Sequence, residues 1–312
     1  MVFFNALQSI LSIVIMIFIG YLLTSKGWLN EEASKIFSKL VCNIALPCLM
    51  LVDLMNNFTK DKLIHLGSGL IIPFVSMAAG YFIAILTSKT LKIDEKSAGT
   101  FRSMFFVSSS IFVGLPVNLA LFGESSVPYV LLYYIANTTF FWTLGVYDIS
   151  KDGISSKKSS IFSLATLKRI VSPPLMGFIL ALILIMINVT PPRFVMDTCK
   201  YVGGLTTPLS MLFIGITMHS VDFKDIKINK DMIALFIGRF LISPLLVFLL
   251  CLYFPIPTLM KKVFIIQAAM PVMTNTAIVA KSFGANHKYA SLMTVTTTLL
   301  SIIFIPFYMI LL

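Results

Sequence analysis

Residues 108–118 read SSSIFVGLPVN, and residues 268–276 read AAMPVMTNT. Each stretch lies in an apolar segment of membrane-crossing length and holds a proline, Pro116 or Pro271, beside small and amide residues. A proline inside a helix removes one backbone hydrogen bond and clashes with the preceding turn. Freed backbone at membrane depth is tolerated only where protein covers it or water fills a cavity. The two stretches therefore predict two broken helices, a pair that is typical of the midplane substrate site of a secondary transporter.

The whole chain is apolar enough to use lipid as its solvent. It has 58% hydrophobic and 12% charged residues and a mean hydropathy of +0.95, whereas a soluble domain carries about 25% charged residues. We therefore expect an all-α membrane protein of the plasma membrane, with the lipid bilayer as a partner. The net charge of +11 falls in short turns between apolar spans, which is a topology signal and does not indicate nucleic acid.

The apolar pattern predicts ten membrane spans of about 20 residues each. They cover residues 5–24, 36–55, 65–87, 101–122, 127–149, 170–189, 201–220, 232–254, 262–281 and 289–312. A polar linker, residues 151–167, separates a five-span repeat at 1–150 from a second at 168–312. An odd number of spans in each half requires the two repeats to be inverted relative to each other.

The distribution of basic residues predicts the orientation of the chain. Of the 24 Lys and Arg residues, 17 fall in connectors on one side of the ten-span arrangement and six on the other, while Arg239 lies within a span. By the positive-inside rule, the richer side is cytoplasmic. The linker at 151–167 is then cytoplasmic, and both termini are extracytoplasmic.

A second pair of prolines supports the repeat. Pro47 and Pro208 are 161 residues apart, and Pro116 and Pro271 are 155 residues apart. These similar offsets favour duplication of one five-span unit. We expect helix breaks at all four prolines and at Gly114, with the fourth and ninth spans crossing at the middle of the membrane.

Polar residues near the two breaks are the candidates for substrate binding. The N-terminus of a half-helix offers unpaired N–H groups and the positive end of its dipole, which suits a carboxylate. Amides and hydroxyls can add contacts, and the candidates of these types are Asn118, Asn275, Asn137, Ser109, Ser110, Thr274 and Thr276. The alternative is that the amides only bind the backbone that proline frees.

Burying an ionisable residue inside a span costs free energy, so such a residue is first considered as a functional one. Arg239 lies in the eighth span. It could neutralise an anionic substrate or a coupling carboxylate, or extend to the cytoplasmic headgroups. Asp53 and Asp148 lie near span ends and are expected to be solvated. No span holds an acidic residue near its middle, which argues against a sodium/proton antiporter.

Several short motifs together resemble the auxin efflux carrier family over nearly the whole chain. They are GYLL at 20–23, GWL at 27–29, LV at 40–41, NIALP at 43–47, GLP at 114–116, ALFGE at 120–124, PLSMLFIG at 208–215, MP at 270–271 with Asn275, and Ala280 with FG at 283–284. Many members carry an asparagine shortly before the first GLP, where this chain has three serines. This difference leaves the substrate open.

The resemblance, which is to the bacterial branch with malate- and malonate-type permeases, implies more than the residues alone do. It implies an inverted five-plus-five repeat similar to that of bile acid symporters and sodium/proton antiporters. It also implies a scaffold of spans 1, 2, 6 and 7, a transport domain of spans 3–5 and 8–10, and a homodimer.

The leading functional hypothesis is a secondary transporter of a small organic anion, a carboxylate, a dicarboxylate or an auxin-like acid, that works by elevator-type alternating access. A sodium-coupled bile-acid-type symporter is the alternative within transport, and the coupling ion, proton or sodium, stays open. An intramembrane enzyme would need a nucleophile–base or metal constellation, and the chain has no HExxH, GxSxG or His/Asp cluster. The four cysteines form no CxxC motif, so we expect neither a metal nor a cofactor. A channel built from the same broken helices is a further alternative.

Overall fold

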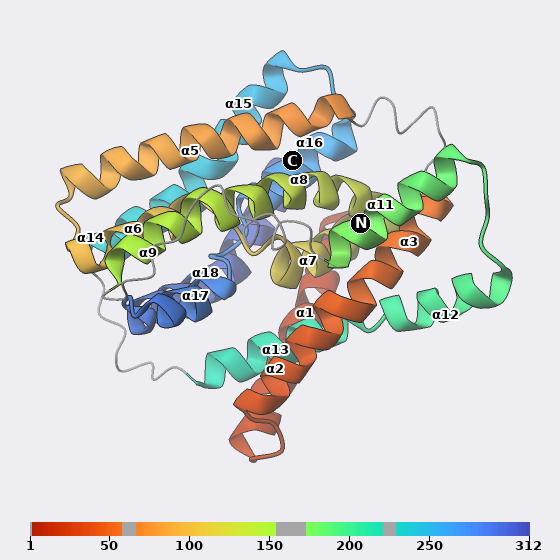
Figure 1. The fold of residues 1–312 in the computed structure, drawn as a ribbon, viewed down its shortest axis with the longest axis horizontal. Helices are drawn as coiled ribbons and strands as arrows, with labels where there is room; N and C mark the ends of the chain where they lie inside the picture. Colours follow the sequence, from red (N-terminus) through yellow and green to blue (C-terminus); the bar gives the residue numbers. More distant parts are fainter. Residues whose placement is uncertain (1, 58–66, 154–172, 221–228) are drawn as a thin grey trace. The chain divides into compact units, whose positions relative to one another are not determined.

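The computed structural model describes residues 2–57, 67–153, 173–220 and 229–312, and these form helices without a β-strand (Figure 1). Within these ranges, five helical stretches are long and apolar enough to cross a membrane: Glu31–Asn56, Ile71–Thr90, Arg193–His219, Lys230–Tyr253 and His287–Tyr308. Shorter apolar helices cover Val14–Ser25, Ser110–Phe122 and Pro173–Met186. The expectation of an all-α membrane protein is therefore confirmed for the described residues.

The chain forms two compact units. The first comprises Met1–Gly69, Ile111–Leu131 and Val171–Ser220, and the second comprises Leu70–Ser110, Leu132–Ile170 and Val221–Leu312. The helices of the first unit are α1 (Val2–Ser25), α2 (Glu31–Leu40), α3 (Leu46–Asn57), α7 (Leu115–Phe122), α11 (Pro173–Met186), α12 (Arg193–Gly203) and α13 (Thr206–His219). The helices of the second unit are α5 (Ile71–Thr90), α6 (Glu95–Phe106), most of α8 (Val127–Phe140), α9 (Val146–Asp152), α14 (Lys230–Ile237), α15 (Ser243–Tyr253), α16 (Thr258–Ala268), α17 (Asn275–Phe283) and α18 (His287–Leu311).

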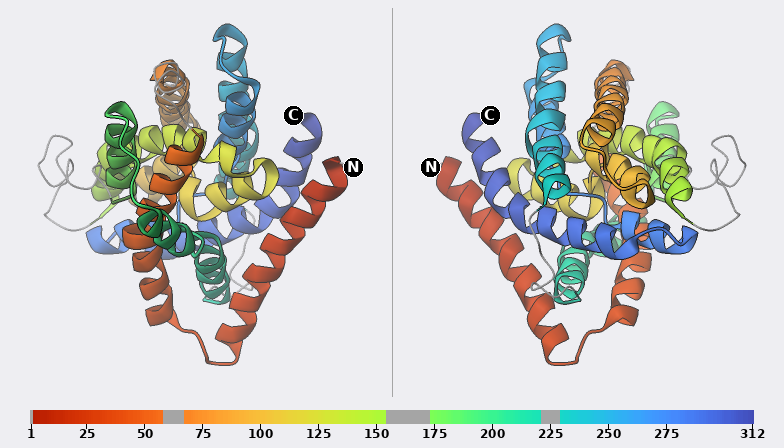
Figure 2. Two further views of the ribbon diagram at one scale, coloured as in Figure 1. Left: turned by 90° about the vertical axis from the view of Figure 1, so that its right-hand side faces the viewer. Right: turned by 90° about the vertical axis from the view of Figure 1, so that its left-hand side faces the viewer.

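A tight turn reverses the chain between α1 and α2, which diverge from it in Figure 2. Gly27 has φ 75°, a left-handed conformation that glycine adopts without steric cost. Its N–H donates to Thr24 O at 2.9 Å, and Trp28 N–H donates to Leu23 O at 2.9 Å, which satisfies two carbonyls at the end of α1. Asn30 then caps α2, since its Oδ1 accepts from Ala33 N–H at 2.9 Å.

Glycines allow close helix contacts in the first unit. A Cβ on Gly215 of α13 would lie 2.6 Å from Tyr21 N of α1, and one on Gly177 of α11 would lie 2.6 Å from Pro47 Cα of α3. A Cβ on Gly203 of α12 would likewise meet Leu49 of α3. Small residues at such contacts let membrane helices approach until their backbones touch.

Three prolines follow a wide, π-helical turn instead of breaking their helix. The turns Val41–Ala45, Ser110–Gly114 and Gly238–Ile242 each end two residues before a proline. Such a turn takes up the missing hydrogen bond and the ring clash that a proline introduces. The expected breaks at Pro47, Pro116 and Gly114 are therefore wrong: these residues are helical, with Pro116 in the first turn of α7. Pro208 lies just after a break, because α12 ends at Gly203 and α13 begins at Thr206.

Polar side chains join α6 to α9 in the second unit. Asp148 is 1% exposed, lies 3.2 Å from Arg102 Nε, and accepts a hydrogen bond from Tyr81 OH at 3.0 Å. One turn further, Asp152 accepts from Gly99 N–H at 2.8 Å and from Thr100 Oγ1 at 2.7 Å. The expectation that Asp148 is solvated is wrong, because these donors compensate its burial. Asp53 is also buried, at 2% exposure.

We predict that Gly215→Ala lowers the free energy of unfolding by about 1–3 kcal/mol, because the new methyl group meets backbone atoms of α1 that cannot move aside. The matched control is Gly204→Ala. A Cβ there would meet only Lys200 O and Tyr201 O, each at 3.4 Å, in ordinary helical backbone. Thermal unfolding of the purified protein in detergent measures both. Equal melting temperatures for the two variants would contradict the close contact of α1 and α13.

Candidate functional site

Two helical segments of the second unit are interrupted. The first interruption comprises Val107–Ser109, between the end of α6 at Phe106 and the turn that begins at Ser110. The second comprises the residues between the end of α16 at Ala268 and the start of α17 at Asn275. Pro271 lies inside the second interruption, as expected, whereas the first interruption precedes Pro116 by seven to nine residues.

The two interruptions pair with each other. Ser108 and Val272 form an antiparallel bridge, the one β-type contact in the described residues, and Ser109 N–H donates to Pro271 O at 2.8 Å. Both bridged residues are fully buried. Pro271 has no N–H to satisfy, so its carbonyl is the group that the pairing supplies with a partner. We call these two paired segments, Val107–Ser110 and Ala269–Thr274, the crossover.

Asn137 of α8 binds the backbone of the crossover. Its Oδ1 accepts from Ser108 N–H at 2.9 Å, and its Nδ2 donates to Ser108 O at 2.9 Å. The same amide reaches Ser110 Oγ at 3.2 Å. An asparagine side chain thus satisfies both backbone groups of a residue that is outside any helix, as buried backbone requires.

Two further side chains satisfy the crossover backbone. Gln267 Nε2 donates to Ser110 O at 3.3 Å, and Thr297 Oγ1 of α18 accepts from Val272 N–H at 3.2 Å. Gln267 Oε1 is buried without a hydrogen-bond partner. The crossover is therefore held by α8, α16 and α18, all within the second unit.

Arg239 joins the C-terminal ends of two half-helices. Its guanidinium donates to Ala268 O at 2.7 Å, to Met270 O at 2.8 Å and to Phe105 O at 3.3 Å. Each helix C-terminus carries about half a negative elementary charge. The C-terminal ends of α6 and α16 together therefore balance the charge of about one guanidinium. Arg239 is fully buried, and of the alternatives that the sequence left open, extension to the headgroups is wrong because the carbonyls of Phe105, Ala268 and Met270 bind the side chain.

Several hydroxyl groups at or beside the crossover are buried and lack a hydrogen-bond partner. They are those of Ser109, Thr138, Thr274 and Thr276. Ser109 and Thr276 are 3% and 0% exposed. Because leaving a buried polar group without a partner costs about 1–3 kcal/mol, unpartnered hydroxyls in a native protein indicate a strain reservoir, an unseen ligand or bound water.

The sequence candidates divide between the two units. Ser109, Ser110, Asn137 and Arg239 lie in the second unit, together with the segment 274–276. Asn275 is half-exposed and begins α17, and its side-chain amide forms no hydrogen bond within the described residues.

Asn118 belongs to α7 of the first unit. It is fully buried, its Nδ2 donates to Gly114 O at 2.7 Å, and its Oδ1 has no partner. Part of this amide thus serves the backbone of its own helix, in line with the alternative that the sequence left open.

Sequence reasoning missed Gln267 and Thr297 as residues of the crossover. Gln267 carried a usable signal, because it is an amide four residues before a proline inside an apolar segment. Thr297 lies in the run TVTTT at 294–298, where neighbouring threonines bond their own helix, as Thr298 Oγ1 does to Thr294 O at 2.8 Å. Thr297 Oγ1 also donates to Met293 O of its own helix, at 2.8 Å, so no local signal distinguishes it as the threonine that accepts from Val272.

Comparisons with known proteins agree with a transport role for this fold. Residues 5–309 match the model of a family described as membrane transport protein. An uncharacterized transporter of Methanocaldococcus jannaschii is 25% identical over 294 residues, which cover 93% of each chain. An uncharacterized transporter of Methanothermobacter thermautotrophicus is 24% identical over 315 residues, which cover 99% of each chain. The chain therefore belongs to the membrane transport protein family, the auxin efflux carrier family that its motifs resemble.

Proposed function

We propose that this protein is a secondary transporter of a small organic anion, and that the crossover of the second unit binds the carboxylate group. The observation that carries the proposal is the set of unpartnered buried hydroxyls beside the start of α17. Hydroxyl groups donate hydrogen bonds to a carboxylate, and the positive end of a helix dipole favours negative charge. Asn275, in the first turn of α17, adds two further donors.

Arg239 supports this site without touching the substrate in our proposal. Its donors are directed at the carbonyls of Phe105, Ala268 and Met270. Its charge balances the negative ends of α6 and α16, so the positive end of α17 is left for an anion. A cation at the crossover would face the positive end of α17, which disfavours sodium at the same position.

A coupling ion would have to bind elsewhere or be a proton. Asn118 Oδ1, in the first unit, is an unpartnered acceptor, and such an acceptor suits either sodium or a bound water. The sodium-coupled alternative is therefore kept. Uptake into proteoliposomes with and without an inward sodium gradient separates the two, since a proton-coupled or uncoupled carrier would not respond to sodium.

The remaining architecture is part of the same proposal. Ten spans form two inverted repeats at 1–150 and 168–312, with both termini extracytoplasmic and the linker 151–167, which lies outside the described residues apart from 151–153, in the cytoplasm. A transport domain of spans 3–5 and 8–10 moves past a scaffold of spans 1, 2, 6 and 7 in a homodimer. In support, the helices that hold the crossover, α6, α8, α16 and α18, pack in one unit. By contrast, the segment Ile111–Leu131, which belongs to the fourth and fifth spans and includes Asn118, packs with the other unit.

We predict that Thr276→Val lowers substrate affinity about 5- to 150-fold while it raises the melting temperature of the free protein. The first effect follows from the loss of a donor to the carboxylate, worth about 1–3 kcal/mol. The second follows because valine removes a buried hydroxyl that has no partner. Purified protein is first screened with mono-, di- and aromatic carboxylates by thermal shift, and calorimetry with the best ligand then gives the affinity.

The matched control is Thr298→Val, a buried threonine of the same unit whose hydroxyl bonds its own helix. It should leave substrate affinity within about twofold of the wild type. Asn275→Ala should lower affinity about as much as Thr276→Val. Wild-type affinity in both Asn275→Ala and Thr276→Val would show that the carboxylate binds elsewhere.

Arg239 gives a separate prediction. Arg239→Lys keeps the charge but cannot reach three carbonyls, and Arg239→Gln also loses the charge. We expect both variants to lose stability and substrate affinity together, with the larger loss in Arg239→Gln, because both act through the crossover. A variant Arg239→Lys that melts like the wild type but binds no substrate would instead identify Arg239 as a direct ligand.

A further inference from the structure

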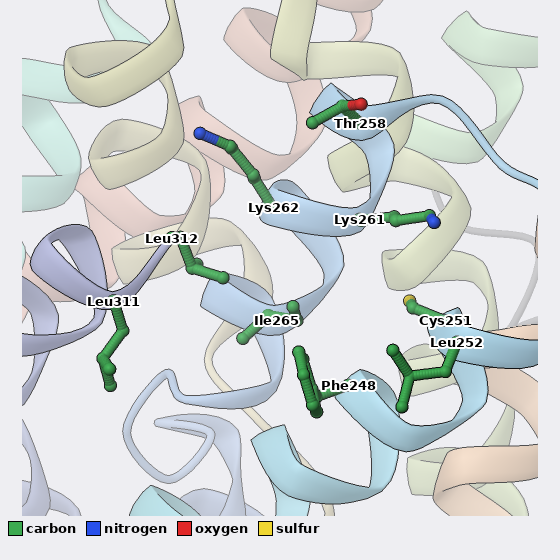
Figure 3. Close-up of a pocket in the computed structure, with 9 residues that line it drawn as sticks. All are labelled: Phe248, Cys251, Leu252, Thr258, Lys261, Lys262, Ile265, Leu311 and Leu312. Atoms are coloured by element: carbon green, nitrogen blue, oxygen red, sulfur yellow. The ribbon is translucent and has the colours of Figure 1, made fainter.

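A pocket of about 250 Å³ lies at the turn between α15 and α16, away from the residues of the crossover (Figure 3). Phe248 and Leu252 come from α15, Lys261 and Lys262 from the first turns of α16, and Leu311 from the end of α18. All belong to the second unit. The membrane-crossing helix Lys230–Tyr253 ends here, so the pocket lies where a span meets the headgroup region.

The walls of the pocket are apolar and open to the surroundings. Leu252 is 64% exposed, Leu311 is 63% exposed and Phe248 is 45% exposed. In a protein that crosses a membrane, exposed apolar side chains at the end of a span contact lipid. The walls therefore suit an acyl chain.

The mouth of the pocket is positively charged and lacks a counter-charge from its own unit. Lys261 and Lys262 are half-buried, and none of the ion pairs among the described residues includes either of them. The sequence from 232 to 312 contains no aspartate or glutamate. Asp231 lies at the other end of the helix Lys230–Tyr253, roughly 35 Å away at 1.5 Å per residue.

The lysines also stand at the unfavourable end of their helix. Basic residues stabilise a helix near its C-terminus and acidic residues near its N-terminus. In α16 no side chain caps the N-terminus and the first turn holds no acidic residue, while Lys261 and Lys262 follow directly. In Figure 3 their ammonium groups point to opposite sides of α16, with Thr258 at the start of the helix between them. An anion at the start of α16 would meet the positive end of the helix dipole and have one ammonium group on either side of the helix.

We propose that this pocket binds an anionic phospholipid, with the phosphate at the start of α16 and an acyl chain along Phe248, Leu252 and Leu311. The apolar walls favour a phospholipid over a free anion, because inorganic phosphate would leave these walls uncovered. The lysine stems can lie along the apolar wall while their ammonium groups reach the headgroup. This site is separate from the proposed substrate site, and its test does not depend on transport.

The test measures lipid affinity with purified protein in a non-ionic detergent. Phosphatidylglycerol and phosphatidylcholine of the same acyl chains are titrated separately, and the rise in melting temperature gives an apparent affinity for each. The wild type should bind phosphatidylglycerol more tightly. The double variant Lys261→Gln/Lys262→Gln should lose about 10- to 30-fold in affinity for phosphatidylglycerol and keep its affinity for phosphatidylcholine.

Two controls make the result specific. Lys200→Gln removes a lysine of the first unit, in the last turn of α12, where the helix dipole favours a basic residue. This variant should bind phosphatidylglycerol like the wild type. Leu252→Asn should lower the affinity for phosphatidylglycerol although both lysines remain. Equal affinity of the wild type for the two lipids, equal loss in Lys200→Gln, or stabilisation by inorganic phosphate as strong as that by phosphatidylglycerol would each overturn the proposal.

Discussion

A backbone that leaves its helix inside a membrane must have its hydrogen bonds satisfied by the protein, and the second unit is organised around this requirement. At the crossover, Ser109 N–H bonds Pro271 O, Asn137 binds both backbone groups of Ser108, and Thr297 accepts from Val272. These partners come from several helices. The crossover is thus a tertiary structure, and its position fixes where α6 and α16 end and where α17 begins.

Burying one guanidinium at the crossover has an electrostatic consequence. Desolvation of a lone charge is expensive, and Arg239 is tolerated because carbonyls from two helix ends bind it. With those negative ends neutralised, the start of α17 keeps its positive potential. In the proposed function, this potential attracts an anion without a basic side chain in the site, and unpartnered hydroxyls such as that of Thr276 are the proposed donors.

The helical fold and the break at Pro271 could be predicted from the sequence because apolar length and proline are local signals. The first break could not be located, since Pro116 is accommodated by the wide turn Ser110–Gly114 and the backbone opens earlier, at Val107–Ser109. Local sequence placed Arg239 within a span but could not decide between the protein interior and the headgroups, because the carbonyls that bind it have no sequence signature. Gln267 and Thr297 resemble ordinary polar residues of a helix until their neighbours are known.

The most direct test of this account is the rate of disulfide formation between Ser108→Cys and Val272→Cys, with the four native cysteines replaced by serine. The hydrogen bond of the bridge joins Ser109 to Pro271, so Ser108 and Val272 are a non-hydrogen-bonded antiparallel pair. The Cα atoms of such a pair are about 4.5 Å apart, within reach of a disulfide. The control pair is Ser108→Cys with Leu252→Cys, at the end of α15. A membrane-permeant oxidant followed by peptide mass spectrometry should link 108 to 272 far faster than 108 to 252. Equal rates for the two pairs would show that the broken segments do not meet, and the proposed anion site would lose its foundation.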